Sequence, residues 1–138
     1  MNGFIVTTFF VRTPSPRPDF RSVAVFLWAQ ETNYDSDGNC SYPADRNWTE
    51  LTLDSRDREN ERVDVDPVIE EPLTLKVNAE HASLATRVAY YLALATDGTV
   101  SEEIDGKYVS AATFRLRLGE YDVESAMQRV ANYLPGHT

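Results

Sequence analysis

The chain has 138 residues and a formal net charge of −9, and hydrophobic residues make up 42% of it. That length suits one domain, and that apolar fraction excludes a chain that stays disordered for want of a core. One cysteine and no apolar run of about 18 residues exclude an intramolecular disulfide and a membrane-spanning helix. The acidic balance also argues against nucleic-acid binding, which relies on Lys and Arg to neutralise phosphates.

The first half of the chain predicts strands that are separated by turns. β-Branched and aromatic residues are frequent there, and several runs alternate apolar with polar residues. We therefore expect strands at residues 4–12, 22–32, 48–54, 62–66 and 73–77. Three closely spaced prolines end the first strand, because proline lacks the backbone donor of a ladder. Residues 35–39, Asp-Ser-Asp-Gly-Asn, are typical of a turn, and Pro67 and Pro72 are expected to bracket another connection.

The second half changes to a helical period. Apolar residues recur every three or four positions in residues 79–96 and 123–134, which predicts two amphipathic helices. Asn78 and Asp122 are suitable N-caps for these helices, and Gly98 is suited to the end of the first one.

Two shorter segments lie between the predicted helices. Asp105 and Gly106 form the strongest hairpin signal in the chain, joining residues 99–104 to residues 107–110. Residues 111–118 fit either a strand or a short helix capped by Ser110, and we favour the helix.

Together these elements predict a single α+β domain at residues 1–138. We expect a mostly antiparallel sheet of five to seven strands, packed by the two main helices. The predicted core joins Leu84, Val88, Leu92, Val130 and Leu134 of the helices to Val25, Leu27, Leu51, Leu53, Leu73 and Leu75 of the strands.

No local pattern assembles a catalytic or metal site. The two histidines, His81 and His137, are not paired in sequence, and the G-x-S-x-G motif around a nucleophilic serine is absent. Cys40 lies among acids, which would raise its pKa and disfavour a nucleophilic thiolate. Residues 35–39 lack the spacing of a calcium-binding loop, so a solvated turn explains them better. We expect no catalytic residue, no metal and no cofactor.

Negative charge is concentrated in residues 50–71, which contain nine acidic and three basic side chains. This block is either a solvated strand face and loop or a surface that attracts a basic partner. Nearby Tyr34, Tyr42 and Trp48 suit either an interface or a small satellite core. The candidate partner-binding residues are Asp54, Asp57, Glu59, Glu61, Asp64, Asp66, Tyr42 and Trp48.

Residues 73–114 combine a predicted strand, an alanine-rich helix, the strand Thr-Asp-Gly-Thr-Val, an Asp-Gly turn and an aromatic strand. This order resembles small acidic immunity-type proteins from bacterial toxin loci. The resemblance covers less than a third of the chain and includes no diagnostic motif, so it transfers no functional residue. It implies a cytoplasmic, non-catalytic inhibitor that covers the active site of a cognate toxin.

The expected function is that of a protein-binding module, specifically an immunity protein that neutralises a basic toxin domain by direct binding. Two other classes stay open: an enzyme or small-ligand-binding domain with a site assembled from distant residues, and a phage or orphan interaction protein. The N-terminal apolar stretch lacks the flanking features of a secretory signal, which predicts a cytoplasmic protein. We expect no membrane or nucleic-acid partner, and a monomer or small homo-oligomer.

Overall fold

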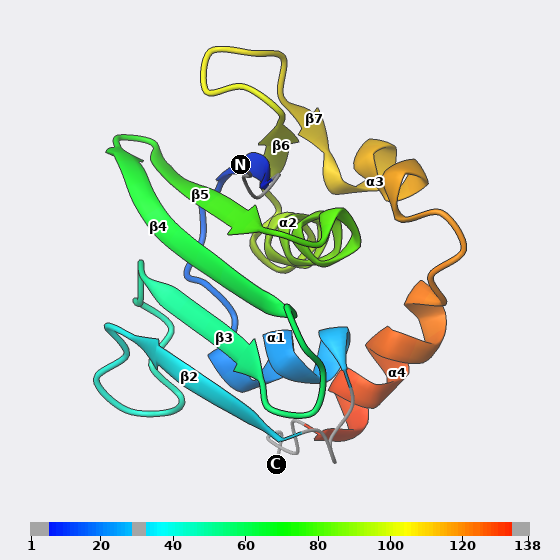
Figure 1. The fold of residues 1–138 in the computed structure, drawn as a ribbon. Coiled ribbons are helices and arrows are strands. Elements are labelled where there is room, and N and C mark those ends of the chain that lie inside the picture. Colours follow the sequence, from blue (N-terminus) through cyan, green and yellow to red (C-terminus); the bar gives the residue numbers. More distant parts are fainter. Residues whose placement is uncertain (1–5, 29–32, 134–138) are drawn as a thin grey trace, which may run out of the picture.

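Seven antiparallel strands form one sheet, in the order β2-β3-β4-β5-β1-β6-β7, in a computed structural model that describes residues 6–28 and 33–133 (Figure 1). The strands are β1 (Thr7–Arg12), β2 (Tyr34–Gly38), β3 (Leu51–Ser55), β4 (Arg62–Glu70), β5 (Leu73–Ala79), β6 (Thr99–Ser101) and β7 (Val109–Ser110). The first strand of the chain thus lies between β5 and β6 inside the sheet. The predicted α+β class and antiparallel sheet are confirmed.

The helices gather on one side of this sheet. They are α1 (Phe20–Leu27), α2 (Ala82–Thr96), α3 (Ala111–Phe114) and α4 (Val123–Tyr133), with the 3-10 helix η1 (Arg115–Leu118) after α3. Figure 1 shows α1, α2 and α4 on the same side of the strands. Within the described residues, no helix covers the opposite side of β2, β3, β4 and β5.

Alternating burial along the strands explains this two-layer arrangement. Successive side chains of a strand point to opposite faces, so an apolar residue at every second position gives one buried face. Leu53, Val63 and Val77 follow this rule and have no exposed surface. They form one buried cluster with Leu84 and Leu92 of α2, as the periodicity predicts.

The main difference from the sequence-based expectation is α1. The sequence predicts a strand at residues 22–32, but residues 20–27 are helical and residues 29–32 lie outside the described part of the chain. Asp19 is the N-cap, and its side chain accepts a hydrogen bond from the backbone nitrogen of Arg21 at 2.9 Å. Every residue from Ser22 to Leu27 is buried. A segment that is apolar all round has the same composition in a buried helix as in a buried strand, so the strand prediction is wrong here.

Two segments that the sequence predicts as connections belong to strands in the structure. Residues 34–38 form strand β2 rather than a turn. Strand β4 continues through Pro67 as far as Glu70, with an irregular register between Pro67 and Ile69. An irregularity of this kind accommodates a proline, which cannot donate to the ladder.

The caps and short segments of the second half give a mixed result. Asn78 belongs to β5, and α2 instead begins after His81, so the predicted Asn78 cap is wrong. Asp122 does cap α4, since its Oδ1 accepts from the backbone nitrogen of Ser125 at 3.0 Å. Ser110 caps α3, which confirms the helical interpretation of residues 111–118. The predicted hairpin at residues 99–110 forms with shorter strands and a longer loop, between β6 and β7.

A polar contact joins α4 to the end of α1. Arg129 of α4 donates to the carbonyl oxygens of Val25 at 3.2 Å and Phe26 at 3.1 Å, and the hydroxyl of Tyr121 also donates to Phe26. The last carbonyls of a helix lack partners within that helix, and they attract positive charge. Arg129 therefore supplies hydrogen-bond donors to the last carbonyls of α1 and links α4 to that helix end.

Candidate partner-binding face

The side of the sheet without helices carries most of the polar strand residues. In β3 and β4, the residues between buried leucines and valines must point away from the helices. The register also places β2 residues Asp35 opposite Asp54 and Asp37 opposite Thr52, so the same alternation applies to the edge strand. Five carboxylates share this side, and we call them the acidic face: Asp35, Asp37, Asp54, Asp64 and Asp66.

One row of side chains crosses the acidic face over four strands. Thr52 of β3 lies beside Asp64 of β4, then Asn78 of β5 and Thr8 of β1. The Thr52 hydroxyl donates to Asp64 Oδ1 at 2.7 Å, and the Thr8 hydroxyl donates to Asn78 Oδ1. Arg62 also pairs with Asp64 at 3.3 Å. Two neighbours therefore hold Asp64 through Oδ1, while its Oδ2 has no partner among residues 6–28 and 33–133 and can accept from an approaching donor.

This face is hollowed by a groove of about 810 Å³. Its charged lining consists of Asp54, Asp64 and Glu80 against Arg62 and Lys76. The remaining lining residues are Val6, Thr8, Asn60, Asn78 and Ala79. Carboxylates and amides of this kind accept hydrogen bonds from lysine and arginine side chains, and the two cations limit the net charge of the groove.

The predicted acidic residues do not all lie on this face. Asp54, Asp64 and Asp66 do, whereas Asp57, Glu59 and Glu61 lie in the loop of residues 56–61 between β3 and β4. Two of these loop acids have partners inside the protein. Glu61 accepts from the indole nitrogen of Trp28 at 2.6 Å, and Asp57 accepts from the backbone nitrogen of Asn33 at 3.0 Å.

The sequence reasoning missed Asp35 and Asp37 as members of the acidic face. The sequence predicts a turn for their segment, although the two acids are separated by one residue. That spacing puts both on one face of a strand, and it is the signal that could have found them. Arg56 pairs with Asp35 at 2.5 Å, and this hydrogen bond, reinforced by the charge of Arg56, lowers the pKa of Asp35.

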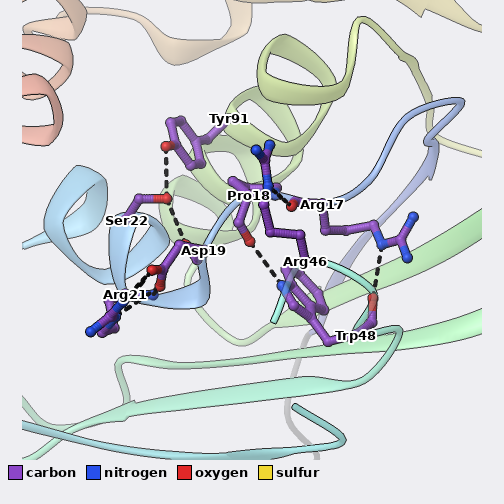
Figure 2. A network of polar contacts seen from close by, with 8 residues as sticks. All are labelled: Arg17, Pro18, Asp19, Arg21, Ser22, Arg46, Trp48 and Tyr91. Atoms are coloured by element: carbon purple, nitrogen blue, oxygen red, sulfur yellow. Dashed lines mark hydrogen bonds and ion pairs between the residues drawn. The ribbon is translucent and has the colours of Figure 1, made fainter. Parts of the chain in front are cut away.

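Trp48 is not available to a partner, which corrects its assignment as a binding residue. Its side chain has no exposed surface, and its indole nitrogen donates to the carbonyl oxygen of Pro18 at 2.8 Å (Figure 2). Arg17 donates to the carbonyl oxygen of Trp48 at 2.8 Å, and Arg46 donates to that of Arg17 at 2.9 Å. Trp48 therefore ties the proline-rich segment before α1 to the β2–β3 loop.

Tyr42 remains exposed, at 59% of its surface, but it is separated from the loop acids. It lies in the loop of residues 39–50, next to the Gly38–Leu51 end of the β2–β3 pair. Residues 56–61 follow the opposite end of that pair, next to Ser55. Five residues of β3 span about 17 Å, so the eight predicted residues do not form one continuous patch.

Cys40 lines a second, smaller hollow of about 350 Å³ between β2 and the residues after it. Burial, together with the charges of Asp45 and Asp19, raises the pKa of the Cys40 thiol. The thiolate that nucleophilic attack requires is therefore scarcer at neutral pH than in a free cysteine.

The structure also locates the histidines and tests for a metal centre. His81 is exposed at the start of α2, and His137 lies outside the described residues. In residues 6–28 and 33–133, no three His, Cys, Asp or Glu side chains come together as a group that could hold a metal ion. None of the helices in those ranges is long and apolar enough to cross a membrane.

Comparison of the chain with models of protein families, with curated proteins and with solved structures gives no match.

Proposed function

We propose that this protein is a non-catalytic binding module that takes a basic partner protein on its acidic face. Within that class, we propose an immunity protein that neutralises a cognate toxin. The observation that carries the proposal is the position of five carboxylates on a sheet side that no described helix covers, where strands β2 to β5 add only Arg62 and Lys76 as cations.

The rigidity of the sheet supports a binding role. Carboxylates on paired strands are held in a fixed pattern, as Asp64 is by Thr52, so binding a partner requires little ordering of side chains. A concentrated negative field also raises the rate at which a cationic protein meets the face. The same field repels phosphates, so a nucleic acid is a poor candidate for this surface.

Inhibition would follow directly from such binding. A toxin that acts on nucleic acids needs a basic groove for phosphates, and a rigid row of carboxylates is complementary to such a groove. Occupation of that groove excludes the substrate without any chemical step by the inhibitor. The proposed site of action is the cytoplasm, and no cofactor takes part.

The proposal is tested with the protein encoded by the gene directly upstream of the gene for the present protein. We expect its expression to stop growth of a bacterial host, and co-expression of the present protein to restore growth. The double variant Asp54→Lys with Asp66→Lys should abolish this protection, because it reverses charge on the acidic face.

A matched control carries the same charge change on the helical side of the molecule. Glu120→Lys with Glu124→Lys alters two exposed acids, one just before and one within α4, and should protect as well as the wild type. Absence of growth protection by the wild type would overturn the immunity proposal. Equal loss of protection in both double variants would overturn the assignment of binding to the acidic face.

A further inference from the structure

The two edges of the sheet differ in length. Strand β7 at one edge has two residues, whereas β2 at the other edge has five, from Tyr34 to Gly38. An edge strand presents unpaired backbone groups to solvent, and a very short edge is one way in which proteins avoid pairing with other chains. The β2 edge is long enough to accept another strand.

The hydrogen-bonding pattern shows which β2 groups face outward. The pairs at both ends of β2 are bonded, since Arg56 donates to the Asn33 carbonyl at 2.8 Å and Asn39 donates to the Glu50 carbonyl at 3.2 Å. Antiparallel pairing alternates bonded with non-bonded residues, so Asp35 and Asp37 direct their backbone groups towards β3. Those of Tyr34, Ser36 and Gly38 are consequently directed away from β3.

Ser36 lies at the centre of this edge. Within residues 6–28 and 33–133, its backbone nitrogen and carbonyl oxygen have no hydrogen-bond partner. The outward nitrogen of Gly38 is already bonded, at 2.8 Å, to Oδ1 of Asp37. An incoming strand would therefore form its central pair of hydrogen bonds with Ser36.

The side chains on either side of β2 define what such a strand must carry. On the acidic face, Asp35 and Asp37 flank Ser36, and both are exposed. On the opposite face, Ser36 and Gly38 border the hollow of about 350 Å³, which Asp37 also lines at its rim. Its other lining residues are Phe20, Cys40, Ser41, Tyr42, Pro43 and Leu51. One face of the edge thus favours positive charge, and the other face accepts an apolar side chain.

We propose that β2 binds an extended segment of the basic partner by strand addition, and that the segment has a basic–apolar–basic pattern. The apolar residue lies opposite Ser36 and enters the hollow beside Phe20. Its two basic neighbours lie opposite Asp35 and Asp37, with Asp37 contributing more because Arg56 already pairs with Asp35. This inference rests on the proposed function, since it assigns the contact through which the basic partner is recognised.

Charge decides against a second copy of this chain as the occupant. Antiparallel pairing of β2 with its own copy about Ser36 would set Asp35 of each chain opposite Asp37 of the other. Like charges directly opposite one another destabilise a strand pair. A strand with alternating arginines removes this repulsion and replaces it with attraction, so the edge favours a basic partner.

The test uses a nine-residue peptide of alternating arginine and valine, with a control peptide of the same composition whose arginines are grouped at one end. Binding to the full chain is measured by isothermal titration calorimetry. We expect the alternating peptide to bind at least about tenfold more tightly than the control. Methylation of the peptide nitrogens on the edge that faces β2 should weaken binding by about tenfold, as the loss of one or two hydrogen bonds predicts.

A protein variant gives a second measurement. Ser36→Pro removes the outward N–H without removing a donor to β3, and proline is tolerated at such edge positions. This variant should bind the alternating peptide about tenfold more weakly than the wild type does. Ser36→Ala, which keeps the N–H, should bind the peptide as tightly as the wild type. If Ser36→Pro fails to fold, the methylated peptide on the wild-type protein decides the question.

The possible outcomes separate this inference from the proposed function. Equal binding of the two peptides, no binding of either, or indifference to methylation would overturn strand addition at β2. None of these results bears on whether the acidic face is required for growth protection. The converse result is peptide binding that is sensitive to methylation, together with no growth protection. It would support strand addition at β2 and would overturn only the immunity function.

Discussion

The indole nitrogen of Trp48 donates to the carbonyl oxygen of Pro18 at 2.8 Å, across 30 positions of sequence. Both residues are buried, and the contact joins the segment before α1 to the loop before β3. Trp48 is therefore a structural residue, and its removal is expected to affect folding before it affects binding.

Replacement of Trp48 gives the first prediction. Trp48→Ala should lower the free energy of unfolding by about 3 to 5 kcal/mol, the range for a buried aromatic residue. Trp48→Phe removes the hydrogen bond to Pro18 and part of the ring volume, so it should cost at least about 1 to 3 kcal/mol. Urea denaturation measures both values. Tyr42→Ala is the control, since this exposed side chain should leave stability within about 0.5 kcal/mol.

The core of the sheet–helix interface gives the second prediction. Leu75 and Leu92 have no exposed surface, so Leu75→Ala or Leu92→Ala should cost about 2 to 5 kcal/mol. Leu116→Ala makes the same chemical change at a side chain that is 87% exposed, and it should cost less than about 0.5 kcal/mol. Similar melting temperatures for Leu92→Ala and Leu116→Ala would contradict the packing described above.

Arg129 provides the third prediction. Arg129→Met keeps most of the aliphatic stem but leaves the carbonyls of Val25 and Phe26 without this donor, at a cost of about 1 to 3 kcal/mol. Hydrogen exchange should accelerate first in α1 and α4. Arg115→Met serves as the comparison, because its exposed ion pair with Glu124 is worth at most about 1 kcal/mol.

The fourth prediction concerns pH. Hydrogen bonds from the backbone nitrogens of Ser41 and Asn47, both at 2.8 Å, lower the pKa of Asp45 in the folded protein. A depressed pKa stabilises the fold above the unfolded value of about 3.9, and this contribution is lost as the pH falls through the lower folded value. Asp45→Asn should thus be less stable than the wild type at pH 7, and the difference should shrink below about pH 4. A difference that stays constant from neutral to acid pH would exclude this role for the carboxylate.

The fifth prediction follows from the proposed function. Association with the product of the upstream gene should slow as salt rises from about 50 to about 500 mM, because ions screen charges beyond about 8 Å at physiological ionic strength. Stopped-flow measurements compare Asp54→Lys with Asp66→Lys on the acidic face against Asp57→Lys with Glu59→Lys in the loop. We expect the face variant to slow association more. An association rate that changes neither with salt nor with either pair of charge reversals would contradict electrostatic steering.

Local sequence patterns determined a large part of this fold. The alternation of Leu51 with Leu53 and of Val63 with Val65 sets which face of each strand is buried, whatever strand lies beside it. The helical period of residues 84–92 likewise predicts α2, and Asp122 predicts the start of α4. These predictions succeed because strand and helix periods are properties of a short segment and need no knowledge of its neighbours.

Tertiary structure alone decided the rest. Residues 23–27 are apolar on every side, so packing against α2 and α4, and not the local period, selects a helix there. Trp48 is buried because Pro18 and Arg17 reach it from about 30 positions away, a contact that no local period reveals. Asp35 and Asp37 join the acidic face only once β2 pairs with β3. Which surfaces remain open depends on these long-range contacts, and the local pattern shows only which faces are polar.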